Sequence, residues 1–288
     1  MKILILGISG MLGHKLAQIL DSDYDLVGLS RKKVTPKLLG LKNTNIVYHD
    51  LLKEDIQFIL NEINPDIIIN CVAITTRRGV EGNVQITKKL NTELPHKLDS
   101  WAVSNSKKLI HFSTDCVFSG NRGNYLENDF TDADDIYGKT KADGEVNSES
   151  TLTLRCSIIG RELYNFTELF EWLVENKNKK ISGYSRVIYS GITTVRMGKI
   201  IKKIIKEYSD LSGIYNISSI PISKFELLTK LSNAFNLNVD INENKNIKSN
   251  KVLISRKFTE ITGIKPPNWD DLIEEFKMDS DKNKSLYK

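Results

Sequence analysis

The stretch Lys2-Ile-Leu-Ile-Leu-Gly-Ile-Ser-Gly-Met-Leu-Gly13 decides the fold. Its first five residues predict a short buried strand, and an apolar periodic segment after them predicts a helix. Between the two, Gly7, Gly10 and Gly13 have the spacing that a pyrophosphate requires: a tight turn, a close backbone approach and tight packing of helix on strand. The helix N-terminus adds unpaired N–H groups and partial positive charge. The stretch predicts a dinucleotide site, and a glycine-rich turn without a ligand is the alternative.

The ends of the next two predicted strands bear on the choice of dinucleotide. A second strand, Tyr24–Leu29, leads into Ser30-Arg31-Lys32-Lys33, where NAD-selective sites usually carry an acidic residue. Ser30 and Arg31 favour the 2′-phosphate of NADPH, with NADH use and a solvated basic loop as alternatives. After a third strand, Asp50 and Leu51 are expected beside the adenine, although Asp50 is equally suited to cap a helix.

Strands and helices alternate along residues 1–155, which predicts βαβ units and a parallel sheet covered on both faces. Helices are expected at 11–20, 53–63, 87–104 and 135–148, with Pro95 bending the third. The predicted fold class is α/β, a Rossmann-type doubly wound parallel sheet that binds the dinucleotide. A smaller α+β lobe, residues 156–288, follows on the C-terminal side to bind the substrate.

Within the second lobe, we expect an amphipathic helix at 165–175 and a short strand at 214–217. A basic amphipathic helix at 193–209 is expected to pack back on the dinucleotide domain. Ser223 is a candidate N-cap for a further helix, and a last helix is expected at 269–277. The final ten residues are polar and are expected to fray.

Composition excludes several classes of protein. The 288 residues are 40% hydrophobic and 27% charged, which is typical of a soluble globular protein. The net charge of +5 indicates solvated basic faces or attraction of an anionic substrate. A nucleic-acid surface is not indicated, because the basic residues do not alternate with aromatic residues. The three cysteines and four histidines lack metal-ligand spacing, so no metal is expected. Without a signal peptide or a membrane span, we expect a cytoplasmic protein.

The candidate catalytic groups are Thr114, Tyr137 and Lys141. Tyr137 and Lys141 are spaced i, i+4 on a predicted helix, which places them on one face. A nearby ammonium is expected to lower the phenol pKa towards neutral, which suits acid–base work. Thr114 ends a predicted strand, and its hydroxyl is expected to hold the substrate oxygen beside the phenol. The alternative is an ordinary pair on a helix surface.

With these motifs the chain resembles the extended short-chain dehydrogenases/reductases, in particular the dTDP-4-dehydrorhamnose reductase family. The resemblance spans most of residues 1–220 and rests on five segments: 7–13, 70–73 (Asn-Cys-Val-Ala), 112–120 (Phe-Ser-Thr-Asp-Cys-Val-Phe-Ser-Gly), 135–145 and 154–157. It implies that Thr114, Tyr137 and Lys141 form a catalytic triad. The cofactor-binding residues inferred from the sequence and the resemblance together are Gly7, Ser9, Gly10, Met11, Leu12, Gly13, Ser30, Arg31, Asp50, Leu51, Cys71, Val72, Ala73, Asn91, Tyr137 and Lys141.

The resemblance implies NADPH-dependent reduction of the C4 keto group of a nucleotide-linked 6-deoxy-4-keto sugar, in the biosynthesis of dTDP-rhamnose or another surface polysaccharide sugar. Two departures leave the sugar open: Cys116 stands where the family usually has Tyr, and Asp134-Asp135 where it usually has a proline nearby. Segments 156–162 and 183–191 look more like a branch acting on UDP-linked 2-acetamido-2,6-dideoxy-4-keto sugars. Residues expected at the substrate are Thr114, Asp115, Arg77, Arg155 and Arg186.

Other functions fit the same fold. An epimerase is an alternative, whereas a dehydratase would need a Glu where Cys116 follows Asp115. The family also resembles a regulatory subunit of methionine adenosyltransferase, so a non-catalytic binding subunit is a further alternative. The intact set of Thr114, Tyr137 and Lys141 argues against that last alternative. The partner expected is a nucleotide-diphosphate sugar, not nucleic acid or a membrane, and the chain is expected to be a monomer or a homodimer.

Overall fold

The computed structural model describes residues 1–75 and 83–287, and in this part of the chain seven parallel strands form a central sheet. The strand order is β11-β6-β5-β4-β1-β2-β3, so the chain starts in the middle of the sheet and winds outward in both directions. This order confirms the predicted doubly wound, Rossmann-type α/β fold. The strands are β1 (Lys2–Leu6), β2 (Asp25–Ser30), β3 (Asn45–Tyr48), β4 (Ile67–Asn70), β5 (Lys108–Ser113), β6 (Thr151–Arg155) and β11 (Gly213–Asn216).

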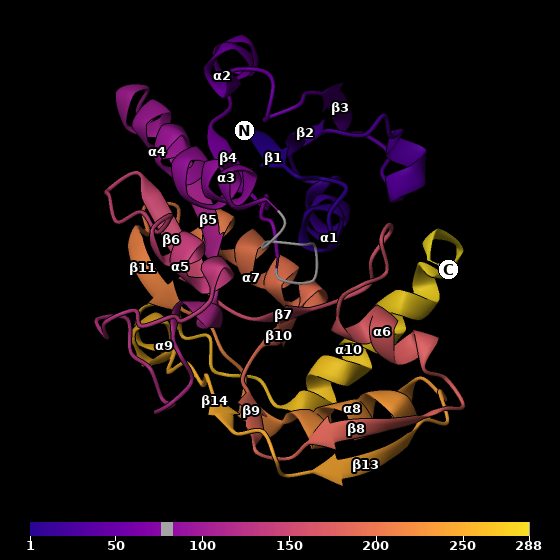
Figure 1. The fold of residues 1–288 in the computed structure, drawn as a ribbon. Helices are drawn as coiled ribbons and strands as arrows, with labels where there is room; N and C mark the ends of the chain where they lie inside the picture. Colours follow the sequence, from indigo (N-terminus) through magenta and orange to yellow (C-terminus); the bar gives the residue numbers. More distant parts are fainter. Residues whose placement is uncertain (76–82, 288) are drawn as a thin grey trace.

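The two faces of the sheet bury different helices (Figure 1). Successive side chains of a strand point to opposite faces. In β1, Ile3 and Ile5 join the core on the side of α1 and α7. Leu4 and Leu6 join the core on the side of α2 and α4. The helices beside the sheet are α1 (Met11–Leu20), α2 (Ile56–Ile63), α3 (Val84–Lys88), α4 (Leu94–Ser104), α5 (Ile136–Ala142) and α7 (Thr194–Glu207).

A smaller α+β lobe lies beyond the α1/α7 face, in the lower part of Figure 1. Ser223 caps one of its helices as predicted: it accepts a hydrogen bond from the backbone N–H of Glu226, whose carboxylate accepts from the Ser223 N–H in return. The elements of the lobe are β7 (Ile158–Ile159), α6 (Leu169–Glu175), β8 (Lys180–Tyr184), β9 (Val187–Tyr189), β10 (Ile192–Thr193), β12 (Ile222–Ser223), α8 (Lys224–Ala234), β13 (Asp240–Asn244), β14 (Ser249–Asn250), α9 (Arg256–Thr262) and α10 (Trp269–Lys282).

Two elements from the second half of the chain, a strand and a helix, belong to the central sheet and its cover. The predicted strand near residues 214–217 does not belong to the smaller lobe, because β11 pairs in parallel with β6 at the edge of the central sheet. Helix α7 packs against α1, and the Ile19 side chain of α1 lies against the Gly198 backbone, where a Cβ atom would lie 2.2 Å from the Cδ1 atom of Ile19. The sheet therefore depends on residues after 155 for one strand and for part of its cover.

Two predicted helices have different bounds in the structure. The helix expected at 87–104 begins earlier, at Val84, and passes through a π-helical turn, Lys89–Glu93, before α4. Pro95 lies in the first turn of α4, directly after this π-helical turn. The helix expected at 135–148 ends at Ala142, and a Cβ atom at Gly144 would lie 1.9 Å from the Asn91 carbonyl oxygen.

The end of the described chain is docked, so the expected fraying was wrong. After α10, the Tyr287 side chain is 8% exposed and its hydroxyl lies 3.0 Å from Nε2 of His14 in α1. The Nδ1 atom of the same imidazole lies 2.8 Å from the carbonyl oxygen of Gly10. Asp279 also forms an ion pair with the buried Lys15 at 2.6 Å. These contacts join the last residues to the helix that begins at the glycine loop.

Candidate active site

The glycine loop has the geometry that a pyrophosphate needs. Gly7 has a φ of +74°, which side chains other than glycine rarely adopt. A Cβ atom on Gly13 would lie 2.2 Å from the Gly7 carbonyl oxygen, so only glycine permits the observed packing of α1 on the loop. Gly10 is the N-cap of α1 and has no side chain to cover the first N–H groups of that helix. The residues present therefore fit a dinucleotide.

Most of the predicted cofactor-binding residues line a cavity of about 170 Å³ that begins at this loop. Gly13 and Leu12 do not line it, since Gly13 packs beneath the loop and Leu12 faces the neighbouring catalytic cavity. Asn91 supports the wall from behind: its side chain accepts from the Ile74 N–H at 2.8 Å and donates to the Ile74 carbonyl at 3.0 Å. The predicted residues on the lining are Gly7, Ser9, Gly10, Met11, Ser30, Arg31, Asp50, Leu51, Cys71, Val72 and Ala73.

Two side chains predicted to contact the cofactor form hydrogen bonds with the backbone of their own turns. The Ser30 hydroxyl donates to the Lys32 carbonyl at 2.8 Å and accepts from the Lys32 N–H at 3.2 Å, so it shapes the turn. Asp50 accepts from the Leu52 N–H at 3.1 Å within a turn, and the N-cap of the helix that follows, α2, is Asp55, so the alternative of a helix cap at Asp50 was wrong. Arg31 is exposed at the cavity, as a 2′-phosphate contact would require.

A segment of the second lobe that the sequence reasoning missed closes the same cavity. Glu162, Leu163, Tyr164 and Asn165 line it opposite the glycine loop. The ammonium of Lys32 lies 4.7 Å from the centre of the Tyr164 ring, a cation–π contact between the two parts of the molecule. No local motif marks this segment, because it is far from the loop in sequence and meets it only through the fold.

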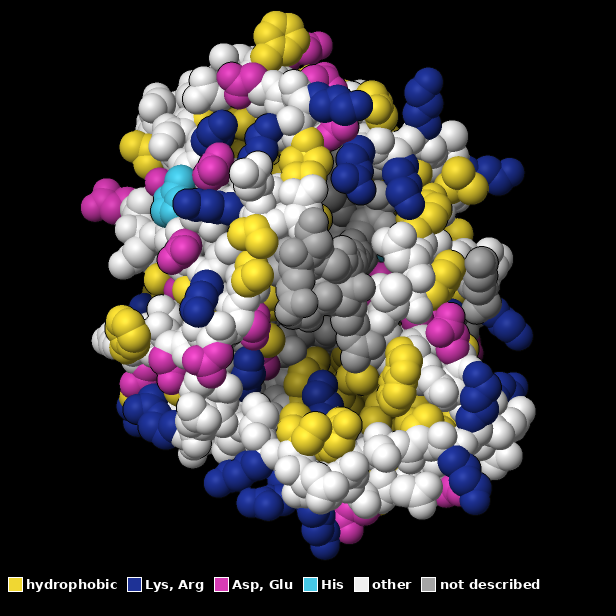
Figure 2. Space-filling view, viewed as in Figure 1, with side chains coloured by type: hydrophobic (Ala, Val, Ile, Leu, Met, Phe, Trp, Pro, Cys, Tyr) yellow, Lys and Arg dark blue, Asp and Glu magenta, His cyan; other side chains and the backbone are white. Residues whose placement is uncertain are grey.

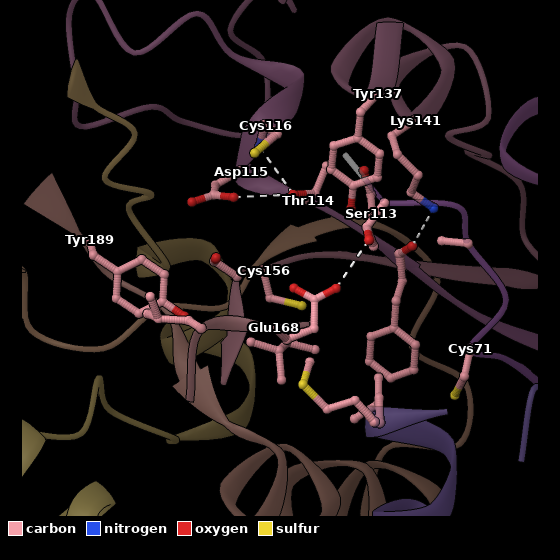
Figure 3. Close-up of a pocket in the computed structure, with 18 of the residues that line it drawn as sticks. Cys71, Ser113, Thr114, Asp115, Cys116, Tyr137, Lys141, Cys156, Glu168 and Tyr189 are labelled. Atoms are coloured by element: carbon pink, nitrogen blue, oxygen red, sulfur yellow. Dashed lines mark hydrogen bonds between the residues drawn. The ribbon is translucent and has the colours of Figure 1, made fainter. Parts of the chain in front are cut away.

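The three candidate catalytic residues converge on a second cavity of about 540 Å³, shown in Figure 3. Thr114 follows β5, whereas Tyr137 and Lys141 both come from α5. Thr114 accepts from the Cys116 N–H at 3.1 Å, and its hydroxyl donates to the Asp115 carboxylate at 3.1 Å. The cofactor cavity and this one share Met11 and the segment 71–73, so a dinucleotide in the first would reach the second.

The predicted tuning of the phenol is not what the structure shows. Burial is the largest cause that raises the pKa of Tyr137, and Cys116 raises it further; a hydrogen bond with Thr114 acts in the opposite direction, and Asp115 and Glu168 have smaller raising effects. The ammonium of Lys141 donates instead to the Phe112 carbonyl at 2.7 Å. Burial also lowers the pKa of Lys141 to about 8. At neutral pH the phenol therefore carries its proton and can donate it.

The three arginines expected at the substrate have different positions. Arg155 is 3% exposed and forms a bidentate ion pair with Glu145, at 2.7 and 2.6 Å, so its guanidinium does not reach the cavity. This expectation was wrong because the sequence does not show that a buried carboxylate already holds the residue. Arg186 is exposed and lies outside the lining of the cavity. Arg77 lies outside the described residues.

The second lobe supplies the far wall of the catalytic cavity. Glu168 projects into it (Figure 3) and accepts from the Thr75 hydroxyl at 3.0 Å. The ammonium of Lys224 lies 3.6 Å from the centre of the Tyr189 ring. In Figure 2, hydrophobic side chains gather in a hollow over the region of β9 and α8. The second-lobe residues on the lining are Cys156, Ser157, Ile158, Glu168, Leu169, Trp172, Ser182, Tyr184, Val187, Tyr189, Lys224 and Leu228.

Two further properties concern the chain as far as the structure describes it. Within residues 1–75 and 83–287, no three His, Cys, Asp or Glu side chains group in a way that could hold a metal ion. In the same ranges, no helix has the length and apolar character that crossing a membrane requires.

Comparison with known proteins places this geometry in a family. The family model described as "RmlD substrate binding domain" matches residues 1–280. The Bacillus subtilis spore coat polysaccharide biosynthesis protein SpsK is 26% identical, with 96% of each chain covered. A dTDP-4-dehydrorhamnose reductase of Aggregatibacter actinomycetemcomitans is 28% identical over 76% of this chain and 74% of its own. The beta subunit of methionine adenosyltransferase 2 of Pongo abelii is 25% identical over 82% and 72%.

Solved structures share the fold. The structure titled a hypothetical dTDP-4-dehydrorhamnose reductase from Sulfolobus tokodaii has a TM-score of 0.80 at 23% identity, covering 96% of this chain and 99% of its own. The Bacillus anthracis dTDP-4-dehydrorhamnose reductase in complex with NADP has a TM-score of 0.75 at 23% identity, covering 97% and 99%. The predicted resemblance is confirmed, and the chain belongs to the RmlD substrate-binding-domain family of extended short-chain dehydrogenases/reductases.

Proposed function

We propose that this protein is an oxidoreductase that uses NADPH to reduce the C4 keto group of a nucleotide-linked 6-deoxy-4-keto sugar. The observation that carries the proposal is the convergence of Thr114, Tyr137 and Lys141 on a cavity continuous with the glycine-loop cavity. When bound, the cofactor supplies the hydride. The names of the relatives, among them a dTDP-4-dehydrorhamnose reductase and a spore coat polysaccharide biosynthesis protein, support a role in making surface polysaccharide sugars.

The residues of the chain have distinct roles in this proposal. Tyr137 donates the proton to the sugar oxygen, because its raised pKa keeps the phenol protonated until negative charge develops on that oxygen. The Thr114 hydroxyl holds the same oxygen. Lys141 binds the nicotinamide half of the cofactor from α5. The second-lobe wall, which brings Lys224 and the aromatic rings of Trp172 and Tyr184 to the cavity, contacts the nucleotide part.

A screen of NADPH oxidation tests the function directly. The purified protein is given dTDP- and UDP-linked 4-keto-6-deoxy sugars, with and without a 2-acetamido group, and the loss of NADPH absorbance is followed. Turnover with one member of the panel is expected. Interconversion of two sugars without net NADPH consumption would instead indicate an epimerase.

A non-catalytic role is the second candidate, favoured by the methionine adenosyltransferase 2 beta subunits among the relatives. Such a subunit would bind a dinucleotide and a partner protein without turnover of any sugar in the panel. In that case Tyr137→Phe would leave the measurable function unchanged, whereas for the reductase it removes the proton donor.

Arg31 sets the preference for NADPH in this proposal. We expect Arg31→Ala to lower kcat/KM with NADPH about tenfold and to leave the value with NADH almost unchanged. A hydrogen bond to a charged group contributes about 1.5–3 kcal/mol, and the lower end applies because Arg31 is exposed. Lys33→Ala is the matched control, since Lys33 is exposed but does not line the cavity. Equal use of NADPH and NADH by the unaltered protein would reject this role of Arg31.

Lys141 and Thr114 should give different kinetic signatures. Lys141→Met is expected to weaken NADPH binding and to lower kcat, because in the proposal Lys141 holds the nicotinamide half of the cofactor that delivers the hydride. Thr114→Val is expected to lower kcat about 10²–10³-fold with little change in NADPH affinity, since its hydroxyl serves the sugar oxygen. Cofactor affinity from NADPH fluorescence and kcat from turnover separate the two. Identical effects on both quantities would mean that the roles are wrongly divided.

A further inference from the structure

Beneath the catalytic lysine lies a buried polar pair that the proposed chemistry does not use. Asn70 ends β4 and His111 lies directly beside it on β5. Asn70 is 1% exposed, His111 0% and Lys141 1%. Three polar side chains so deeply buried need hydrogen-bond partners, and here they are each other's partners.

The backbone fixes which way the pair is oriented. The N–H of Val72 can only donate, and it meets Asn70 at 3.1 Å, so the amide oxygen faces it. The Asn70 amide nitrogen is then the atom that lies 3.2 Å from Nδ1 of His111, and it donates to that nitrogen. Nδ1 therefore carries no proton. Burial lowers the pKa of His111 well below its usual range, so the ring is neutral and its one proton is on Nε2.

That Nε2–H group faces the lysine. Nε2 lies 3.4 Å from Nζ of Lys141, whose other contact is the Phe112 carbonyl at 2.7 Å. An N–H facing an ammonium places two donors against each other, whereas a neutral amine can accept the same N–H. The carbonyl accepts a hydrogen bond from either form of the lysine. We propose that His111 is a positioning residue of Lys141: with its tautomer fixed by Asn70, it presents an N–H to the lysine nitrogen and favours the neutral amine.

The other titratable groups near Lys141 and His111 do not fix the protonation state of Lys141 by themselves. Glu145, one turn further along the chain from Lys141, favours the ammonium, but it is bound by Arg155. The Cys156 thiol, after β6, acts in the same direction as Glu145. From α4, His96 acts weakly on His111. Burial is the largest cause of the lowered pKa of Lys141, about 8, so the ammonium fraction falls as the pH rises through that value. Near that pH a modest bias from His111 changes the charge of the site.

The Asn70 amide also connects the lysine to the cofactor wall. It holds the N–H of Val72, which lines both cavities, while its other end orients His111. The proton state of Lys141 and the shape of the wall beside the nicotinamide thus depend on one side chain. The kinetic meaning of this inference rests on the proposed function, but the tautomer and the cofactor affinity do not.

The tautomer can be measured on the unaltered protein without substrate or cofactor. Nitrogen-15 NMR of the imidazole rings distinguishes Nε2–H from Nδ1–H, and His111→Gln identifies which of the four histidine signals is that of His111. We expect a neutral ring with Nε2–H that does not titrate as the pH is raised through about 8. An Nδ1–H tautomer or a charged ring would overturn the proposal, whatever the protein catalyses.

Two substitutions test the consequence for Lys141. In Asn70→Asp, the carboxylate accepts from both Val72 N–H and His111 Nδ1–H, so Nε2 becomes an acceptor that favours the ammonium. In His111→Gln, the amide can turn its oxygen to the lysine. Both are expected to shift the alkaline limb of the pH profile upward by about one unit, in NADPH affinity from fluorescence and in kcat/KM. His96→Gln, which removes an imidazole that does not contact Lys141, is the control and should leave the limb in place.

The proposal is overturned if the alkaline limb of the pH profile is unshifted in both variants and circular dichroism shows that both are folded. If no sugar is turned over, the proposed function fails, but the tautomer and the pH profile of cofactor affinity still decide the role of His111. If a variant does not fold, the tautomer in the unaltered protein decides it.

Discussion

Replacing Tyr137 with Phe is expected to lower kcat for the reduction by about 10²–10⁴-fold, the usual contribution of a positioned general acid. The phenyl ring keeps the packing against the cavity wall, and the glycine loop is untouched, so NADPH affinity should be preserved. The loss is large because the site is buried and water is a poor substitute for the phenol. The raised pKa of Tyr137 also predicts that activity does not fall at neutral pH through loss of the phenol proton.

Tyr184→Phe provides the matched control for this prediction. Tyr184 lines the same cavity, from β8 in the second lobe, and in the proposal it contacts the nucleotide part of the substrate. Its replacement should leave kcat nearly unchanged, and any effect should be in the KM of the sugar nucleotide. Turnover by the Tyr137→Phe variant at the rate of the unaltered enzyme would show that another group is the proton donor.

The second large effect concerns stability. Arg155→Met is expected to lower the free energy of unfolding by about 3–5 kcal/mol, because Glu145 would keep its charge in a buried site without its partner. The side chains of Arg155 and Glu145 are 4% and 7% exposed, which removes solvent as a substitute. The Ser113 hydroxyl, which donates to Glu145 at 2.6 Å, is too little to balance the charge. Urea or guanidinium denaturation at neutral pH measures the change.

Two comparisons sharpen this prediction. Arg186→Met removes an exposed guanidinium and should change stability by no more than about 0.5 kcal/mol. In the double variant Arg155→Met with Glu145→Leu, much of the lost stability should return, because no charge remains buried. A single Arg155→Met variant as stable as the unaltered protein would mean that Glu145 becomes solvated or protonated at little cost.

The sequence predicts those features of the fold and the site that depend on a short, continuous stretch of chain. The glycine loop predicts the fold, and the Tyr137–Lys141 spacing predicts the candidate catalytic groups, because each pattern lies within a few residues of chain. The partners of buried polar groups cannot be seen in this way. Arg155 looked available although Glu145 holds it, and Lys141 was expected to tune the phenol although its ammonium donates to the Phe112 carbonyl.

The missed parts of the site come from distant segments. Tyr164 meets Lys32 across the cofactor cavity, and Glu168 enters the catalytic cavity from the start of α6. No spacing rule links these residues to the loop, since only the packing of the second lobe brings them there. β11 was assigned to that lobe for the same reason: a four-residue strand does not indicate which sheet it joins.

The docking of α7 on α1 has a consequence for how the protein emerges from the ribosome. Until residues 194–207 have left the exit tunnel, the apolar side of α1 that includes Leu16 and Leu20 lacks the side chains that cover it. His14 likewise acquires its contact with Tyr287 only after residue 287 has been added. The glycine loop is thus synthesised long before the residues that support the helix behind it, so we expect cofactor binding only after residues 194–287 have been made.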